Sequence, residues 1–182
     1  MSETKPYDDD QLKVILTQEQ IEEKIIELGK KISEDYAGQV LVMIGVLRGS
    51  TYFLIDLTRK MNIPFAIDFI SISQYSEQAS STGVVRITKD LDVSISDKQV
   101  LIVEDIVDTG LSLGYLLRNL KTRNPAGLKV CTLLNVEARR IVEVPVDYKG
   151  FEIPNIFVVG YGLDYNEKYR NLQYIAELKR PK

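Results

Sequence analysis

A series of predominantly apolar segments, separated by helical or polar stretches, constrains the fold of this 182-residue chain more than any other feature. Strands that are buried on both faces of a parallel sheet are near-continuous apolar runs of this kind. The predicted strands are VLVMIGVL (40–47), FAIDFISI (65–72), VLIVED (100–105), KVCTLLNV (129–136) and NIFVVGYG (155–162), with further extended structure in VVRITKDL (84–91).

Helices are predicted between these strands, over about 18–36, 50–62 and 112–122. The first begins at a capping box formed by Thr17 and Gln20, and its apolar residues recur at helical spacing. Alternating strands and helices predict an α/β fold with an open, mainly parallel sheet flanked by helices. Ligands of such sheets bind at the carboxyl ends of the strands. The regions to search are therefore 48–50, 104–112, the residues from 136 onward, and 160–164.

Composition excludes several classes of function. The formal net charge is −3 and no basic run occurs, so neither a nucleic-acid nor a membrane-surface partner is expected. The N-terminal segment MSETKPYDDD is polar and acidic, unlike a signal peptide, and no apolar run approaches membrane-spanning length. The single cysteine, Cys131, indicates a reducing compartment. We therefore expect a cytoplasmic protein whose residues 1–182 form a single domain.

The chain contains no histidine, which removes the commonest general base and the usual zinc ligand. If the protein is an enzyme, its acid–base chemistry falls to Asp, Glu, Lys or Tyr. Any metal is then expected to be a hard, oxygen-bound cation such as Mg²⁺.

The segment VLIVEDIVDTGLS (100–112) carries the strongest chemical signal. Glu104 and Asp105 accept hydrogen bonds when ionised and therefore suit a sugar diol or a divalent metal. Residues 108–112 form a short loop that enters a helix, where backbone N–H groups attract a phosphate. The pattern fits a ribose 5-phosphate. The alternative is a solvated acidic turn in which Asp108, Thr109 or Ser112 caps the helix.

Together with three other segments, VLIVEDIVDTGLS resembles the type I phosphoribosyltransferases. LRGS (47–50) is similar to the family's pyrophosphate loop and STGVV (81–85) to the stem of its mobile active-site loop. Residues 150–172 resemble the base-binding segment of the members that act on hypoxanthine and guanine. The resemblance covers about residues 12–178 and implies the family's fold, with a mobile loop at about 74–83 and a small base-binding hood at about 150–182.

The resemblance implies that the substrate is 5-phosphoribosyl pyrophosphate (PRPP) with Mg²⁺, and that a purine nitrogen displaces pyrophosphate at C1 of the ribose. Glu104 and Asp105 would hold the ribose hydroxyls, and Asp108 would also be the general acid/base. A cis peptide bond is implied between Leu47 and Arg48. The residues implied to hold the 5-phosphate are Asp108, Thr109, Gly110, Leu111 and Ser112; those for pyrophosphate are Arg48, Gly49 and Arg170; those near the metal are Glu104, Asp105 and Asp164.

For the base, the resemblance implies that Ile106 and Phe157 sandwich the purine, while the backbone of Val158 and Asp164 reads its polar edge. Ile106 and Phe157 could equally be plain core residues. Tyr75, in the polar segment 74–83, is expected to close over the reacting centre and exclude water. The family's usual assembly is a homodimer or homotetramer.

Two positions depart from the family pattern. Gln74 precedes Tyr75 where the family has serine, and Val136 stands where the family has a lysine that donates to the purine 6-oxo group. Without that lysine, 6-oxo selectivity would rest on backbone groups or on Arg139 or Arg140, and we expect it to be weaker or altered.

The leading interpretation is an enzyme of purine salvage that converts hypoxanthine and/or guanine to IMP or GMP, releasing pyrophosphate. Two alternatives stay open. One is a phosphoribosyltransferase for adenine or xanthine. The other is a regulator on the same fold that senses PRPP or a nucleotide, which would keep the sugar-phosphate contacts but need no working base site.

Overall fold

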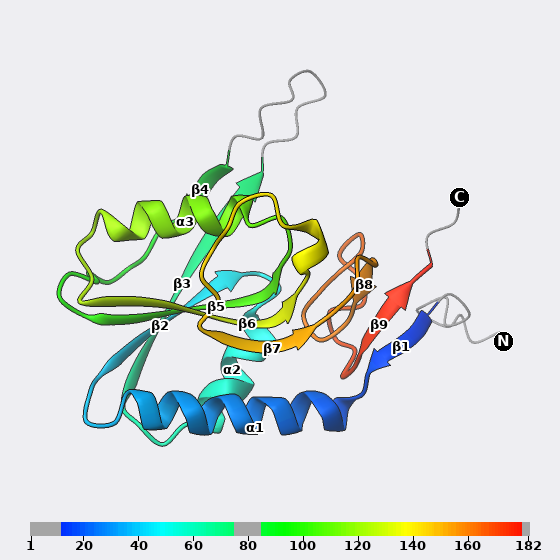
Figure 1. Ribbon diagram of the computed structural model, residues 1–182, viewed down its shortest axis with the longest axis horizontal. Coiled ribbons are helices and arrows are strands. Elements are labelled where there is room, and N and C mark those ends of the chain that lie inside the picture. The colour runs from blue at the N-terminus through cyan, green and yellow to red at the C-terminus, as the bar shows by residue number, and fades with distance from the viewer. Residues whose placement is uncertain (1–11, 75–84, 180–182) are drawn as a thin grey trace, which may run out of the picture.

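The central sheet of this computed structural model has six strands in the order β4-β3-β2-β5-β6-β7 (Figure 1). The structure describes residues 12–74 and 85–179. Its strands are β2 (Leu41–Leu47), β3 (Phe65–Gln74), β4 (Val85–Lys89), β5 (Gln99–Val107), β6 (Gly127–Asn135) and β7 (Tyr148–Glu152). The pairs from β3 to β7 are parallel, and only β4 runs antiparallel to its neighbour. The predicted open, mainly parallel sheet is confirmed.

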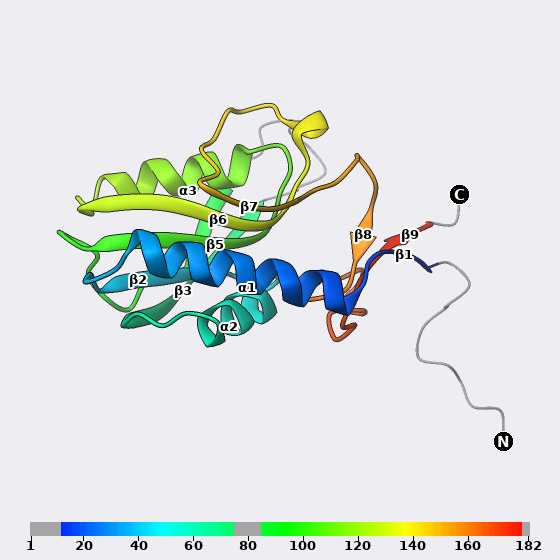
Figure 2. The same cartoon turned by 60° about the horizontal axis from the view of Figure 1, so that its bottom comes forward.

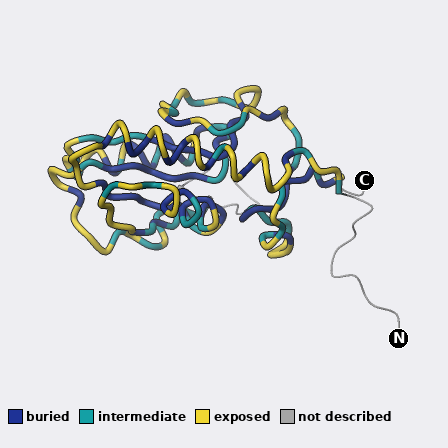
Figure 3. Tube along the Cα trace, turned by 90° about the horizontal axis from the view of Figure 1, so that it is seen from below, coloured by how far each residue is buried: buried dark blue, intermediate teal, exposed yellow. Residues whose placement is uncertain are grey.

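Helices cover both faces of this sheet, with α1 (Gln18–Asp35) and α2 (Thr51–Arg59) on one side and α3 (Leu111–Lys121) on the other (Figure 2). The predicted capping box of α1 forms, since Thr17 accepts from the Gln20 amide and the Gln20 side chain accepts from the Thr17 amide. Alternate residues of the central strands point to opposite faces. In β2, Met43 packs with α1 and α2, whereas Ile44 packs with α3. The central strands lie in dark blue in Figure 3, beneath helices whose outer faces are exposed.

A second, three-stranded sheet joins the two ends of the described chain. Its order is β1 (Leu12–Leu16), β9 (Ile175–Leu178) and β8 (Val158–Val159), all antiparallel. Figure 1 shows it beyond the end of β7. The predicted strand over 155–162 is therefore reduced to two residues of this small sheet, and the edge of the central sheet is formed by β7 instead. The hood expected from residues 150–182 also takes in the N-terminal strand β1.

The connection between β6 and β7 contains a short 3-10 helix, η2 (Glu137–Arg139). Within the described residues, no helix is long and apolar enough to cross a membrane.

Candidate active site

The carboxyl ends of β2 and β5 lie in direct contact. The Leu47–Arg48 peptide bond is cis, as expected from the sequence. Gly49 follows and is buried. A Cβ atom at Gly49 would stand 1.5 Å from the Asp105 Oδ2 atom, so no side chain other than glycine's fits unless the carboxylate moves. The predicted pyrophosphate loop and the predicted diol carboxylates are therefore brought together.

Glu104 and Asp105 stand in different surroundings although they are adjacent. Glu104 is 7% exposed, on a part of β5 that pairs with Thr132 of β6, whereas Asp105 is partly buried. Burial raises the pKa of Glu104 well above its ordinary value, and the charges of Asp105 and Asp108 raise it further. Burial also raises the pKa of Asp105, opposed by its hydrogen bond from the Ile106 amide and by Arg170. Ionisation of these two carboxylates is therefore unfavourable in the absence of a ligand.

The loop from β5 to α3 has the geometry of an anion site. Gly110 is the N-cap of α3 with φ of 78°, and it supplies no capping side chain to the first turn. Asp108, Thr109 and Ser112, the N-cap residues of the alternative interpretation, are not the N-cap, because the helix begins one residue earlier than expected. The Thr109 hydroxyl still accepts from the Leu111 amide at 3.4 Å. The Asp108 Oδ1 atom accepts a hydrogen bond from the Thr109 amide instead.

Residues 140–142 brace this loop from outside. The Ile141 and Val142 amides both donate to the Thr109 carbonyl, at 2.9 and 3.0 Å. A Cβ atom at Gly110 would lie 2.2 Å from the Val142 carbonyl oxygen, so this position also requires glycine. The brace uses the Thr109 carbonyl, while the first N–H group of the helix, that of Leu111, donates to the Thr109 hydroxyl at 3.4 Å.

The C-terminal segment reaches the same place. The Gly49 carbonyl oxygen lies 2.1 Å from where a Cβ atom of Gly162 would be. Arg170 donates to the Gly162 carbonyl at 2.8 Å and forms an ion pair of 2.8 Å with Asp164. Asp164 in turn accepts from the Glu167 amide. Arg170 and Asp164 are thus placed together beside the β2 loop.

Glu167 joins the two arginines and was not singled out from the sequence. Its Oε2 atom lies 2.9 Å from Arg48 Nη1 and 3.4 Å from Arg170 Nη2. One carboxylate therefore sits between the guanidinium groups of Arg48 and Arg170. The Arg170 guanidinium was predicted to bind pyrophosphate, whereas for Arg48 the prediction concerned its backbone N–H group. No sequence signal distinguishes Glu167 from the other charges of LDYNEKYR, because the contact joins residues 119 positions apart.

The predicted purine contacts are only partly assembled. Ile106, Val136 and Val158 belong to one apolar cluster, whereas Phe157 packs in a different cluster and meets Tyr165 edge-on at 5.7 Å. Val158 lies in the small sheet opposite Glu177. Ile106 and Phe157 do not pack directly on each other, and their predicted sandwich of a purine stays a prediction.

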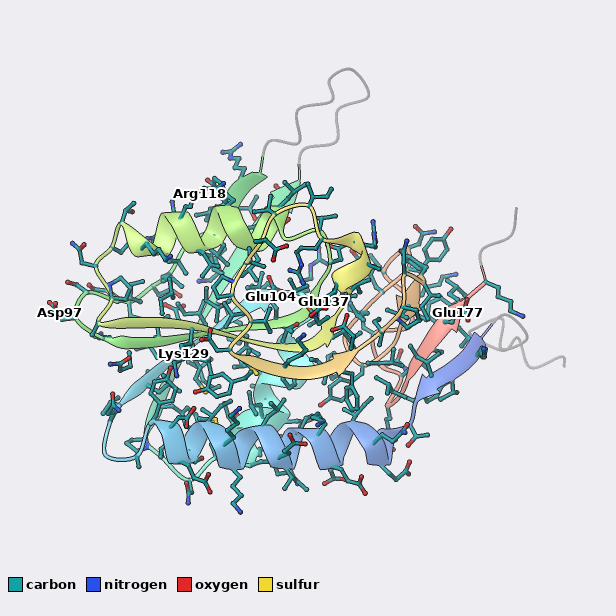
Figure 4. All side chains as sticks on the ribbon, in the orientation of Figure 1. Asp97, Glu104, Arg118, Lys129, Glu137 and Glu177 are labelled. Atoms are coloured by element: carbon teal, nitrogen blue, oxygen red, sulfur yellow. The ribbon has the colours of Figure 1, made fainter. Side chains whose placement is uncertain are left out.

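Val136 is 2% exposed and offers no polar group to the site. Its amide already donates to the Val107 carbonyl. Arg139, three residues on, forms an ion pair of 3.1 Å with the Asp108 Oδ2 atom. Figure 4 labels Glu104 and Glu137 toward the carboxyl ends of β5 and β6, away from the end of the sheet where Asp97 is labelled.

Glu104, Asp105 and Asp164 do not form a metal cage by themselves. Among the described residues no group of three or more acidic, histidine or cysteine side chains could hold a metal ion. Mg²⁺ is commonly bound by one or two carboxylates with substrate oxygens completing its shell, and Glu104 with Asp105 fit that requirement. Tyr75 and the STG segment lie outside the described residues.

An open parallel sheet whose strand exits carry carboxylates and an anion-binding loop is suited to bind a sugar phosphate. Comparison with known proteins agrees. The sequence model of the phosphoribosyl transferase domain matches residues 11–166, and the chain belongs to this family. Within the family, the chain groups with the hypoxanthine-guanine phosphoribosyltransferases. The enzyme of that name from Mycobacterium avium is 51% identical over 178 residues, covering 94% of this chain and 88% of its own.

Two further relatives support this placement. The hypoxanthine-guanine phosphoribosyltransferase of Dictyostelium discoideum is 48% identical, covering 91% of this chain and 94% of its own. The crystal structure of a hypoxanthine phosphoribosyltransferase from Staphylococcus aureus superposes with a TM-score of 0.89 at 44% identity, covering 93% of each chain. The chain is therefore a pentosyltransferase of the type that the sequence resemblance implied.

Proposed function

We propose that this chain transfers the 5-phosphoribosyl group of PRPP to hypoxanthine and/or guanine, giving IMP or GMP and pyrophosphate in purine salvage. The observation that carries the proposal is the meeting of three segments at one edge of the sheet. Gly49 contacts Asp105 and the Gly162 backbone, while Arg170 spans Gly162 and Asp164. A diol acceptor and the pyrophosphate loop are thereby brought together with Arg170, a few residues before the anion loop that follows Asp105.

In this proposal each part of PRPP meets groups of the chemistry it needs. The ribose hydroxyls donate to Glu104 and Asp105, and the 5-phosphate accepts from the N–H groups that open α3. The pyrophosphate lies against the backbone of Gly49 and the guanidinium groups of Arg48 and Arg170, displacing Glu167 from between them. Glu104 and Asp105 would hold Mg²⁺, which would supply positive charge to the leaving pyrophosphate.

Asp108 performs the proton transfer. As the bond from the purine imidazole nitrogen to C1 forms and the bond from C1 to the pyrophosphate oxygen breaks, the carboxylate takes the proton of the imidazole ring. Its Oδ1 atom is fixed by the Thr109 amide, which leaves Oδ2 to face the base together with Arg139. Closure of Tyr75 and the loop over the reacting centre stays a prediction.

The proposal includes a cytoplasmic location and assembly into a homodimer or homotetramer. The buried, unpaired thiol of Cys131 supports a reducing compartment.

A panel of bases tests the proposed function. The purified protein is incubated with PRPP, Mg²⁺ and each of hypoxanthine, guanine, xanthine and adenine, and nucleotide formation is followed by absorbance and mass spectrometry. We expect PRPP-dependent formation of IMP and/or GMP with faster turnover of 6-oxopurines than of adenine. Preferred turnover of adenine would transfer the assignment to another base. Absence of any nucleotide, with PRPP still bound, would support the regulator instead.

A further inference from the structure

The exit of β6 lacks a polar side chain that could read the purine. Val136 is buried and apolar. Asn135 is already engaged, because its amide donates to Glu152 at 2.7 Å and its oxygen accepts from Arg140. No side chain at this strand exit is therefore free to donate to a base bound near Asp108.

Arg139 is the cation that reaches Asp108. Its Nη1 atom lies 3.1 Å from Asp108 Oδ2, while Asp108 Oδ1 is occupied by the Thr109 amide. The two side chains are 47% and 38% exposed. Exposed ion pairs of this kind contribute little to the stability of a fold, so the contact has no strong structural purpose. The exposure also leaves the remaining guanidinium donors open to a ligand.

The segment that carries Arg139 is fixed by its neighbours. Glu152 accepts from the Glu137 amide at 3.0 Å and from Asn135, and Lys149 pairs with both Glu137 and Glu152. On the other side, the Ile141 and Val142 amides donate to Thr109 of the Asp108 loop. Arg139 is thus tied at both ends to strands and loops of the site, and its guanidinium is presented to Asp108 from a set position.

The chemistry of purines matches this pair. N7 and the 6-substituent share one edge of the base, where hypoxanthine and guanine present an oxygen acceptor and adenine presents an amino donor. Guanidinium has only donors and carboxylate only acceptors. A carboxylate that accepts the N7 proton beside a guanidinium that donates to O6 is complementary to a 6-oxopurine. Adenine would place its amino donor against the guanidinium.

We propose that Arg139 is the specificity-determining residue for the 6-oxo group, donating to O6 while it orients Asp108 toward N7. The proposal rests on the proposed function and sharpens it. The sequence led us to expect weaker or altered 6-oxo selectivity because Val136 replaces the lysine. With Arg139 as the donor, the selectivity is instead retained.

The test measures the ratio of kcat/KM for hypoxanthine to that for adenine in wild type, Arg139→Ala and Arg139→Lys. If adenine is not turned over, its Ki against hypoxanthine replaces its kcat/KM. We expect Arg139→Ala to lower the ratio by about 10- to 100-fold, through the hypoxanthine value, and Arg139→Lys to restore part of it. Arg118→Ala, which removes an exposed arginine from α3 (Figure 4), is the matched control and should leave the ratio unchanged.

A rescue variant separates recognition from structure. Adding Val136→Lys to Arg139→Ala should return the hypoxanthine preference, because an ammonium group then reaches the same edge of the base. An unchanged ratio in Arg139→Ala, or an equal fall for both bases, would overturn the inference while leaving the proposed function intact. If Arg139→Ala unfolds, the same ratio of kcat/KM values is measured in Arg139→Gln, which keeps a neutral donor. Failure of wild type to convert any base would instead refute the proposed function.

Discussion

The three carboxylates at the end of β5 are arranged for a ligand more than for stability. Glu104 is almost fully buried beside Asp105, and burial raises its pKa well above the ordinary value. A buried carboxylate without a cation costs free energy at neutral pH. Substrate hydroxyls and Mg²⁺ would supply the missing partners, so the site trades folding stability for binding.

Glu104→Gln should therefore stabilise the ligand-free protein and weaken PRPP binding. A raised carboxyl pKa means that wild type loses stability as the pH rises above the unfolded value of 4.5 toward the folded one. We expect the variant's Tm to exceed wild type by about 2–8 °C at pH 8, for roughly 1–2 kcal/mol, and the difference to vanish below about pH 4. PRPP affinity should fall by about 10- to 100-fold, since charge-assisted hydrogen bonds are lost.

Scanning calorimetry across this pH range, with titration calorimetry of PRPP, measures both effects. Glu23→Gln, on the exposed face of α1, is the control and should change neither. A lower Tm for Glu104→Gln at pH 8 would show that its carboxylate is satisfied within the protein.

At the scale of elements, two close backbone approaches join three segments that are far apart in sequence. The loop after β2 contacts Asp105 through Gly49, and its carbonyl contacts Gly162 of the C-terminal segment. At these approaches only the width of one backbone separates the groups predicted to bind the diol from those predicted to bind pyrophosphate. Side chains of any size at either glycine would separate them.

Gly49→Ala should lower kcat/KM for PRPP by about 100-fold, because a displacement of the order of 1 Å at a reacting centre has this effect. Its Cβ atom would stand 1.5 Å from the Asp105 carboxylate. Gly127→Ala is a sharp control, because its Cβ atom would meet only the flexible end of Gln99, at 2.0 Å, at the amino end of β6. Steady-state kinetics and circular dichroism of both variants check the prediction. Equal activities would show that the contact at Gly49 has no functional weight.

At the scale of the whole molecule, the central sheet and its helices were predictable because burial on both faces leaves a local sequence pattern. β2, β5 and β6 are apolar runs, and α1 carries its own capping box. The small sheet was not predictable from local pattern, since β1 and β9 pair across almost the whole chain. β7 was missed for a similar reason, because YKGFE has no apolar periodicity and is a strand only beside β6.

Part of the candidate site was likewise predictable from local sequence, and part was not. The acidic strand exit and the glycine of the anion loop could be recognised in the segment VLIVEDIVDTGLS, and the structure places them at one edge of the sheet. Glu167 between two arginines and Arg139 against Asp108 depend on tertiary contacts alone. Val136 was singled out from the sequence, and Arg139 was one of two candidate donors there, but only the structure shows that Arg139 pairs with Asp108.

In the proposed reaction the strand exits bind PRPP while Asp108 performs the proton transfer. The decisive experiment is single-turnover formation of IMP, measured beside PRPP binding in wild type and Asp108→Asn. Asparagine keeps the oxygen that accepts from the Thr109 amide, so PRPP affinity should stay close to wild type. The single-turnover rate should fall by about 10²- to 10⁴-fold. A rate near that of wild type, or loss of PRPP binding with the chemical step unimpaired, would show that Asp108 does not perform the proton transfer.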